Sequence, residues 1–445
     1  MAERASEGGG DAAGPRRLPP EHPWRVALTE ELHARPIEPV VAPARLSFLA
    51  LLCDGTEREA AWAAMRDLAL RHGAAPPSPG AVHHSAELGG IRVTWELHTE
   101  FYRCVVQRPG AEAEQPFAAP AIDALPADWV AALPGRLIAA GHLVLLRGAA
   151  DRPRLDLAAG ARQFSGGAVF GSAPADGAAT VLSDFRIHAD GFARFLAEDR
   201  AMTARQAGRM AQRLIEIDIY RATAQLALPV ARELGPVLTR FEQALSEIAA
   251  AQVAGGEAME AALLDRLTRL AADVESWHAR TRFRFDAAAA YHALVERRIA
   301  ELRERRIEGF STLEEFLDRR LAPARATCIA VARRHEALSQ HVARATQLLS
   351  TRVGVTRERQ AQALLASMDR RGQLQLHLQQ TVEGLSIAAI TYYITGLIAY
   401  LAKGAKSAGL ASLDPEMTAA ACIPVVALAV GLGILRIRRS LSRDG

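Results

Sequence analysis

The stretch Thr381–Gly404, TVEGLSIAAITYYITGLIAYLAKG, decides between a soluble and a membrane architecture. It contains a run of 19 residues without a formal charge, 384–402, and a second run of 19 follows at 417–435. A helix needs about 20 apolar residues to cross roughly 30 Å of hydrocarbon. Paired helices of a soluble protein would alternate polar and apolar faces over this length. We therefore expect two transmembrane helices, joined by an external loop at 403–416.

The arginines around the two runs predict how this hairpin is oriented. Arg370 and Arg371 precede the first run, and a basic tail at 436–445 contains four more arginines. The expected external loop carries Lys403 and Lys406, whose charges are partly balanced by two acidic residues. An excess of Lys and Arg marks the cytoplasmic side of a membrane protein. We therefore expect a multi-pass protein with both termini in the cytoplasm and the lipid bilayer as its partner.

The first run carries a stripe of small and hydroxylated residues. Small residues let helices approach closely, and hydroxyl groups form hydrogen bonds across the contact. The stripe packs against the second run, where small residues recur at 427–431 and 429–433, or copies from several subunits surround a pore lined by its threonines. The packing interpretation is preferred. The stripe consists of Gly384, Ala388, Thr391, Thr395 and Ala399.

A bundle and stalk of long helices is expected at 201–383, where the residue pattern is helical. We expect the last helix to begin at Pro323 and to run to Leu401, a length of 79 residues. A short helix before it is expected to begin with a capping box at Ser311 and Glu314. Breaks are expected near Pro229, Gly235-Pro236, Gly255-Gly256, Gly309 and Pro323.

One face of the stalk helix carries a row of residues, which we call the seam, that is a candidate contact between subunits. Its residues recur at spacings of four and three, the 3.5-residue repeat of a coiled coil. The seam packs either within its own domain or against another subunit. The sequence favours neither, because the seam includes His335 and Ala345 and lasts under four heptads. Its members are Val331, His335, Leu338, Val342, Ala345 and Leu349.

Residues 21–200 are expected to form a cytoplasmic α/β domain with a mixed sheet, because the pattern changes every ten to fifteen residues. The run RLSFLALLCDG at 45–55 is apolar enough to be a buried strand. A helix follows, with a capping box at Thr56 and Glu59 and a stop at Gly73. The whole chain is thus predicted to be an α+β membrane protein: an α/β domain, a long-helix bundle and stalk, and a C-terminal transmembrane hairpin.

Several further strands are expected in this domain. The segment 81–106 is predicted to form two strands joined at Gly89-Gly90, a dipeptide that tolerates positive φ. The glycine-rich segment 166–177 lacks the Gly-Lys-Ser/Thr ending of a phosphate-binding loop, which favours a hairpin with its turn at Asp176-Gly177. Short strands are also expected at 141–148, 154–159, 166–172 and 179–187.

The composition argues against several classes of function. The 53 basic and 50 acidic residues nearly balance, so no nucleic-acid partner is expected. No catalytic motif is visible, so neither an enzyme activity nor a cofactor is expected. Residues 1–20 lack the apolar region of a signal peptide and are expected to form a disordered tail. The scattered cysteines indicate neither a zinc site nor a disulfide framework: Cys53, Cys104, Cys328 and Cys422.

The histidines are weak candidates for metal binding. His83-His84 and His98 could meet across the expected hairpin, but adjacent residues on a strand point to opposite faces. Cys328 and His335 share a helix face but have no third ligand nearby. Surface histidines, a core cysteine and a seam histidine are the preferred interpretations, and no metal is expected.

The segment HPWRVALTEELHARP at 22–36 is a dense polar cluster. Its residues His22, Arg25, His33 and Arg35 could bind an anion. Alternatively, the segment docks the N-terminus onto the α/β domain, and this interpretation is preferred.

Five motifs resemble those of a known bacterial family: HPWRVALTEELHARP, FRIHADGFARFLAEDR at 185–200, QRLIEIDIYR at 212–221, RRLAPARATC at 319–328 and QTVEGLSIAAITYYITGLIAYLAK at 380–403. Together they are similar to the family known as domain of unknown function 3422, whose members are described as predicted membrane-anchored proteins. The resemblance implies a protein of the bacterial inner (cytoplasmic) membrane, with no assigned activity and no catalytic residues to carry over.

The order of parts is also similar to that of the CorA superfamily of pentameric magnesium and zinc transporters. The Gly-Met-Asn tripeptide of that superfamily is absent, and Tyr400-Leu401-Ala402-Lys403-Gly404 occupies its place. A lysine at a pore entrance repels divalent cations. Two functions therefore stay open. One is a homo-oligomeric transporter or channel of unknown ion, pentameric if CorA-like, and the other is a membrane-anchored cytoplasmic scaffold or sensor.

Overall fold

The structure, a computed structural model, consists of two compact units. Unit 1 combines Met1–Ala249 with Leu267–Ala343, and unit 2 combines Ala250–Arg266 with Arg344–Gly445. The expected tail at 1–20 lies almost entirely outside the residues that the structure describes. The described residues are 19–26, 28–29, 36–148, 156–164, 168–409 and 414–441.

Unit 1 is built on a mixed sheet, in which nine strands are present among the described residues. Their spatial order is β2-β3-β4-β1-β5-β8-β7-β6-β9, and neighbours are antiparallel except for the parallel pair β5 and β8. The predicted mixed sheet is therefore confirmed, within an α+β fold. The strands are β1 Ala44–Leu52, β2 His83–Leu88, β3 Ile91–Leu97, β4 Phe101–Pro109, β5 Arg136–Arg147, β6 Phe170–Ala173, β7 Ala179–Ser183, β8 Ala193–Asp199 and β9 Arg305–Arg306.

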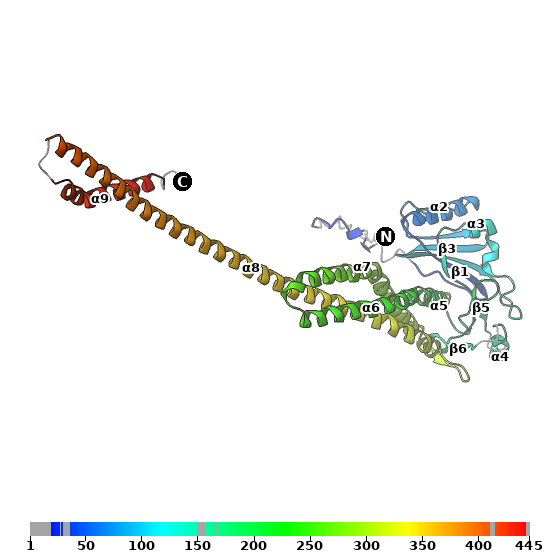
Figure 1. Ribbon diagram of the computed structural model, residues 1–445. Helices are drawn as coiled ribbons and strands as arrows, with labels where there is room; N and C mark the ends of the chain where they lie inside the picture. Colours follow the sequence, from blue (N-terminus) through cyan, green and yellow to red (C-terminus); the bar gives the residue numbers. More distant parts are fainter. Residues whose placement is uncertain are drawn as a thin grey trace, which may run out of the picture. The chain divides into compact units, whose positions relative to one another are not determined.

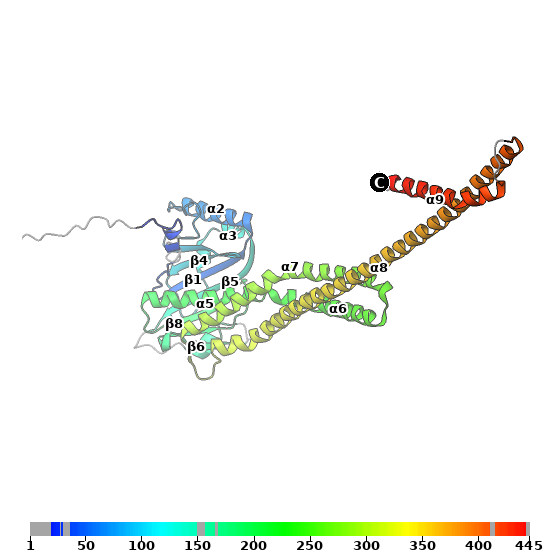
Figure 2. The same ribbon diagram turned by 90° about the vertical axis from the view of Figure 1, so that its left-hand side faces the viewer.

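Strand β1 is central in the sheet and buries residues on both faces. Phe48 belongs to a core that includes α5 (Ala204–Ala224), whereas the next residue, Leu49, belongs to a second core that includes α2 (Gly55–Arg71) and α3 (Ala127–Ala131). Figures 1 and 2 show α2 and α3 on one face of the sheet and α5 on the other. A strand covered on both faces has a continuous apolar sequence, which is how the run at 45–55 was recognised as a buried strand.

The hairpin at Gly89-Gly90 is confirmed, because both glycines have positive φ between β2 and β3. The expectation of two strands over 81–106 was wrong, since β4 follows β3 after a short turn and pairs with it. The turn at Asp176-Gly177 between β6 and β7 is also confirmed.

Two other sheet predictions need correction. The strand expected at 154–159 is replaced, in its described part, by the helix α4 Leu157–Ala161, whose first amides are capped by the Asp156 carboxylate. Strand β8 was missed, because three of its seven residues are charged and hide its buried apolar positions. The charged residues are Arg194, Glu198 and Asp199.

The capping boxes lie one or two residues before or after their predicted positions. Helix α2 is capped by Asp54 with Glu57, because Thr56 already lies within the first turn. The last long helix of unit 1 is capped by Thr312 with Glu315 rather than by Ser311 with Glu314.

Long helices follow the sheet, as predicted. The break near Pro229 is confirmed, because α5 ends at Ala224 and α6 begins at Ala227, which places Pro229 in the first turn of α6, where a missing amide costs nothing. The breaks near Pro236 and Pro323 were wrong, because both prolines lie inside helices. The breaks at Gly255-Gly256 and near Gly309 are confirmed. The helices are α6 Ala227–Ala254, α7 Glu257–Leu302, α8 Leu313–Ser407, which has 95 residues, and α9 Pro415–Leu441.

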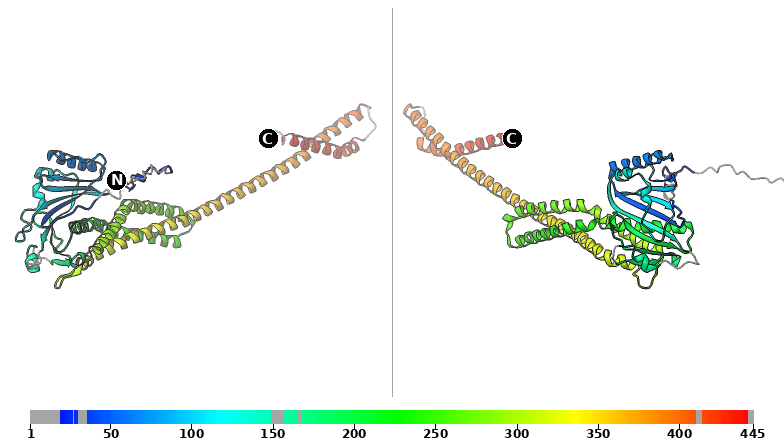
Figure 3. Two further views of the ribbon diagram at one scale, coloured as in Figure 1. Left: turned by 180° about the vertical axis from the view of Figure 1, so that it is seen from behind. Right: turned by 90° about the vertical axis from the view of Figure 1, so that its right-hand side faces the viewer.

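Within unit 1, helices α6, α7 and α8 lie side by side (Figure 3). The seam residues His335, Leu338 and Val342 are buried there. A ring nitrogen of His335, Nε2, lies 3.0 Å from the carbonyl oxygen of Val274 on α7, and Arg334 forms an ion pair with Glu242 on α6. This part of the seam is therefore used inside the chain, in agreement with the intrachain interpretation.

Unit 2 contains the end of α6, the beginning of α7, the later part of α8 and α9. Both α8 and α9 include a segment that is long and apolar enough to cross a membrane, judged by length and composition. Figures 1 and 3 show α9 folded back beside the end of α8, so the two helices form a hairpin.

Candidate functional site

The small-residue stripe of α8 is covered at its centre. Thr391 and Thr395 are buried, whereas Gly384 and Ala388 are exposed and Ala399 is half-buried. The Thr395 hydroxyl donates a hydrogen bond to the Thr391 carbonyl at 2.8 Å. The Thr391 hydroxyl has no hydrogen-bond partner in the described part of the chain. The stripe is therefore not uniform, since its two hydroxyl groups lie in the least accessible part.

One face of α9 is also partly covered. Ala427 and Gly431 are half-buried, as are Cys422, Val426 and Val430 on the same side of the helix. The other pair of small residues proposed for packing, Ala429 and Gly433, is exposed. Of the two small-residue motifs in the second run, only the first therefore lies on the covered face.

The polar cluster of the N-terminal segment is only partly described. His22 and Arg25 are exposed and interact with sequence neighbours: Arg25 pairs with Glu21, and the His22 ring accepts a hydrogen bond from the Trp24 amide. His33 and Arg35 lie outside the described residues. The structure therefore does not test whether the four predicted residues form a site.

The segment that follows this cluster, residues 36–40, docks on the α/β domain, and we call it the strap. The Val40 amide donates to the Ala204 carbonyl at 3.0 Å, and Gln107 donates to the Pro39 carbonyl at 3.2 Å. The strap crosses α5 at Gly208 so closely that a Cβ atom there would lie 2.1 Å from the carbonyl oxygen of Glu38. Only glycine fits at this crossing.

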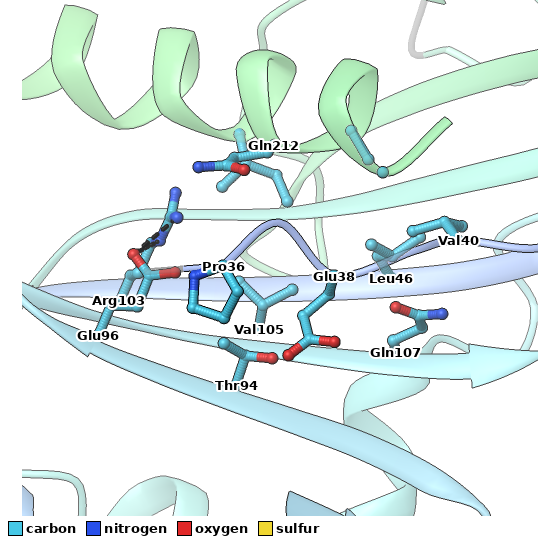
Figure 4. A pocket seen from close by; sticks show the side chains of 13 residues that line it. Pro36, Glu38, Val40, Leu46, Thr94, Glu96, Arg103, Val105, Gln107 and Gln212 are labelled. Atoms are coloured by element: carbon cyan, nitrogen blue, oxygen red, sulfur yellow. Dashed lines mark hydrogen bonds and ion pairs between the residues drawn. The ribbon is translucent and has the colours of Figure 1, made fainter. Parts of the chain in front are cut away.

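A small cavity of about 50 Å³, lined by both polar and apolar side chains, lies beneath the strap (Figure 4). One water molecule needs roughly 10–15 Å³ of such space, so the cavity can hold a few water molecules. Its polar lining comes from four elements: Glu38 of the strap, Thr94 and Glu96 of β3, Arg103 and Gln107 of β4, and Gln212 of α5.

A buried charge cluster adjoins the cavity. Arg103 contacts the Glu96 carboxylate at 2.7 Å and the Glu216 carboxylate of α5 at 3.4 Å, and all three side chains are 5% exposed. Arg298 of α7 pairs with the second oxygen of Glu216, so acidic and basic groups alternate. Gln212 also donates to Glu216 at 2.8 Å.

The electrostatics of this cluster are set by mutual pairing. Burial alone would raise the pKa of Glu96, but the positive charge and hydrogen bonds of Arg103 outweigh burial and lower that pKa to about 2. The two carboxylates likewise raise the pKa of Arg103 despite its burial. Glu96 and Arg103 are therefore both charged at neutral pH, and the cluster joins β3 and β4 to α5 and α7. Sequence analysis missed it, although a Glu and an Arg within apolar strand segments were a visible signal.

A second polar group joins the buried side chains of Ser47 and His142 to the exposed Asp190. Ser47 Oγ lies 2.9 Å from His142 Nδ1, and it accepts a hydrogen bond from the Ile122 amide at 3.1 Å. The Ser47 hydroxyl hydrogen is then free to donate to Nδ1, which assigns the ring proton to Nε2, 4.0 Å from Asp190 Oδ2. Burial lowers the pKa of His142 to about 4, so the ring is neutral at pH 7. Ser47 is fully buried, so its hydroxyl cannot reach a substrate.

The other histidine and cysteine candidates do not assemble into a site. Cys328 packs against alanines of α6 and α7, whereas His335 contacts the Val274 carbonyl. His83, His84 and His98 are half-buried, and His98 lies 3.6 Å from Glu96. Among the described residues, no group of three or more His, Cys, Asp or Glu side chains is arranged to hold a metal ion.

Comparison with known proteins identifies the family. The family model described as "Protein of unknown function (DUF3422)" matches residues 20–441. Neither the search of curated proteins nor the search of solved structures finds a match, so the similarity to CorA rests on the order of parts alone. Because the family model covers almost the whole sequence, including all five motifs quoted above, the chain belongs to the DUF3422 family.

Proposed function

We propose that this chain is an integral protein of the bacterial inner membrane, in which the hairpin of α8 and α9 anchors a cytoplasmic scaffold or sensor. The observation that carries this proposal is the exposure of apolar side chains on the hairpin. Large side chains of α8 and α9 are more than half exposed, among them Leu385, Leu397, Leu401, Val425 and Leu428. Keeping such a side chain in water instead of an apolar phase costs about 1.5–3 kcal/mol. A lipid bilayer removes that cost for the whole hairpin.

The charge distribution supports an orientation with both termini in the cytoplasm. Arg370, Arg371 and Arg436 flank the hairpin on one side, whereas the connecting loop carries Lys403 and Lys406 together with acidic residues. In this orientation the α/β domain and the α6–α8 bundle lie in the cytoplasm.

The stripe favours a role as an anchor rather than a role as a pore. Thr391 and Thr395 are already buried in the chain by itself, so their hydroxyl groups are not presented to a neighbouring subunit or to water. Lys403, near the external end of the first span, adds a positive charge where a cation would enter.

An oligomeric ion transporter or channel is the second candidate. The observation in its favour is the Thr391 hydroxyl, which is buried without a partner in the described residues, because a polar group within a membrane span commonly marks an ion path. The order of parts, which resembles that of CorA, also fits this candidate.

Cysteine labelling of intact cells tests the anchoring and its orientation. In a Cys422→Ser background, we expect Ser407→Cys in the loop to react with a membrane-impermeant maleimide. Gln379→Cys, exposed on α8 before the hairpin, should react only after the membrane is opened. The opposite pattern would reverse the orientation, and release of the chain by alkaline carbonate would exclude membrane insertion.

Ion flux into liposomes separates the two candidates. The test compares the wild-type protein with a double variant, Thr391→Leu and Thr395→Leu. Absence of flux for the common monovalent and divalent ions supports the anchored scaffold or sensor. A flux that the double variant abolishes establishes the transporter instead.

A further inference from the structure

One stretch of α8 in unit 2 is exposed along its whole length. Every residue from 357 to 382 is exposed, including large apolar side chains such as Leu364, Met368, Leu378 and Val382, each about 60% exposed or more. The stretch begins where contacts with α7 end: Leu349 and Val353 are still buried, and Arg352 pairs with Glu260. In the described part of the chain, no other element covers residues 357–382.

The exposed apolar residues form a second seam, distinct from the one at 331–349. We call it the stalk seam, and its positions alternate at spacings of three and four, which is the repeat of a coiled coil. Leu376 lies on the opposite face of the helix, although it is exposed to a similar degree. The stalk seam consists of Ala361, Leu364, Met368, Arg371, Gln375, Leu378 and Val382.

Exposure of this surface to water and its burial in the lipid bilayer are both unfavourable. Apolar side chains exposed in a row are driven to bury their surface. The bilayer cannot cover them, because Glu358, Asp369 and Arg370 place charges around the same part of the helix. A row of this kind calls for a protein partner.

We propose that the stalk seam binds the stalk seam of further copies of this chain, in parallel and in register. This inference rests on the proposed membrane anchor, because α8 passes without interruption from the stalk seam into the first apolar run. Copies inserted in one membrane with one orientation hold their stalk seams at the same height, so Leu364 meets Leu364 and Leu378 meets Leu378. A second copy is thus the one partner whose seam is matched in spacing, height and direction.

Gln375 and the flanking positions of the stalk seam agree with this arrangement, whereas Arg371 meets the like charge of its counterpart. Gln375 aligns with its counterpart, and a polar residue at a seam position specifies register at some cost in stability. Leu365 and Leu374 flank the seam on its two sides and are 65% and 59% exposed. They widen the apolar surface, which allows each helix to contact two neighbours. The part of the seam at 331–349 that belongs to unit 1 packs within the chain. We therefore assign the contact between subunits to the stalk seam instead.

Disulfide cross-linking of the full chain in its native membrane tests the proposal. The background is Cys422→Ser, since the other three cysteines are buried. We expect Leu378→Cys to form a dimer under mild oxidation at least about tenfold more efficiently than Leu376→Cys, because a disulfide requires Cβ atoms about 4 Å apart. Equal or absent cross-linking of the two variants, with the chain in the membrane fraction, would overturn the proposal.

The mass of the purified protein in detergent provides an independent test. We expect a mass of two or more whole chains for the wild type and for the control Leu376→Ser. The double variant Leu364→Ser and Val382→Ser should shift to the monomer mass. A wild-type monomer, or a complex whose mass requires a different protein, would contradict self-association.

These experiments also separate the two proposals. A monomeric chain that stays in the membrane removes the self-association and leaves the anchor in place. A chain recovered in the soluble fraction removes the anchor itself, whatever its mass.

Discussion

The α/β unit and the last part of α8 differ in which side chains they bury and which they expose. In unit 1 even charged groups are buried and paired, as for Arg103 between Glu96 and Glu216. In unit 2 apolar groups such as Leu364 and Leu397 are exposed. The α/β unit therefore contains the partners that its side chains need, whereas the stalk seam and the hairpin would, under the two proposals above, find theirs in lipid and in further copies of the chain. The same difference shows where a mutation acts on folding and where it acts on assembly.

The largest effect should come from breaking the charge cluster of unit 1. Replacing Arg103 with Met leaves the Glu96 and Glu216 carboxylates buried without their shared partner, and removing one member of a buried pair costs about 3–5 kcal/mol. Denaturant unfolding of the full chain in detergent, followed by tryptophan fluorescence, measures this loss. The matched control is Arg71→Met, which breaks an exposed pair with Asp128 and should cost less than about 1 kcal/mol. Equal losses for the two variants would show that burial does not govern the cluster.

The second effect concerns how the free energy of unfolding of unit 1 depends on pH. Burial lowers the pKa of His142 from 6.5 to about 4 in the folded state. A histidine with a lowered pKa contributes stability above its unfolded pKa, and that contribution is lost as the pH falls from 6.5 towards 4. The loss amounts to about 3 kcal/mol at the acid end. Unfolding free energies measured between pH 7 and pH 4 should fall less steeply in His142→Gln than in the wild type. Parallel curves for the two proteins would exclude His142 as the source.

The third effect tests the closeness of the strap to α5. Gly208→Ala introduces a Cβ that meets the Glu38 carbonyl, so the strap or the helix must move, at a cost of about 1–3 kcal/mol. Limited proteolysis should then cut the chain near residues 36–40 more rapidly than in the wild type. The control Gly55→Ala, whose Cβ meets nothing within 4 Å, should leave both stability and cleavage unchanged. An unchanged cleavage rate in Gly208→Ala would show that the strap does not depend on this crossing.

Local patterns in the sequence predicted the elements of the fold well. The apolar run at 45–55 and the turn at Gly89-Gly90 each follow from neighbouring residues, and both are present. The contacts between Arg103 and Glu216, or between Ser47 and His142, could not be predicted in this way. They depend on strand register and on helices more than ninety residues away in the chain.

The stalk illustrates a different limit of sequence reasoning. Two seams with the same repeat occur in α8, and the sequence does not state which one is covered by the chain itself. Only the packing of His335 against α7 and the exposure of Leu364 distinguish them. The hairpin stripe was equally ambiguous, because small residues favour close packing with any helix that approaches.

The smallest effect is expected at the start of α8. This helix begins within unit 1, and its later part, within unit 2, is exposed. Its first amides are all satisfied: Glu304 accepts hydrogen bonds from the amides of Leu313 and Glu314, and Thr312 accepts one from Glu315 at 3.2 Å. Thr312→Ala should therefore destabilise unit 1 by about 1 kcal/mol, which is typical for loss of an N-cap.

Ser311→Ala is the matched control, because Ser311 is the cap that the sequence favoured and its side chain has no such role in the structure. Its unfolding midpoint should equal that of the wild type, whereas Thr312→Ala should unfold at lower denaturant. The reverse order would move the start of α8 back to the predicted position. Since neither variant touches the stalk seam, both should keep the wild-type mass in detergent, and a change in mass would mean that the folding of unit 1 and the assembly through unit 2 are not independent.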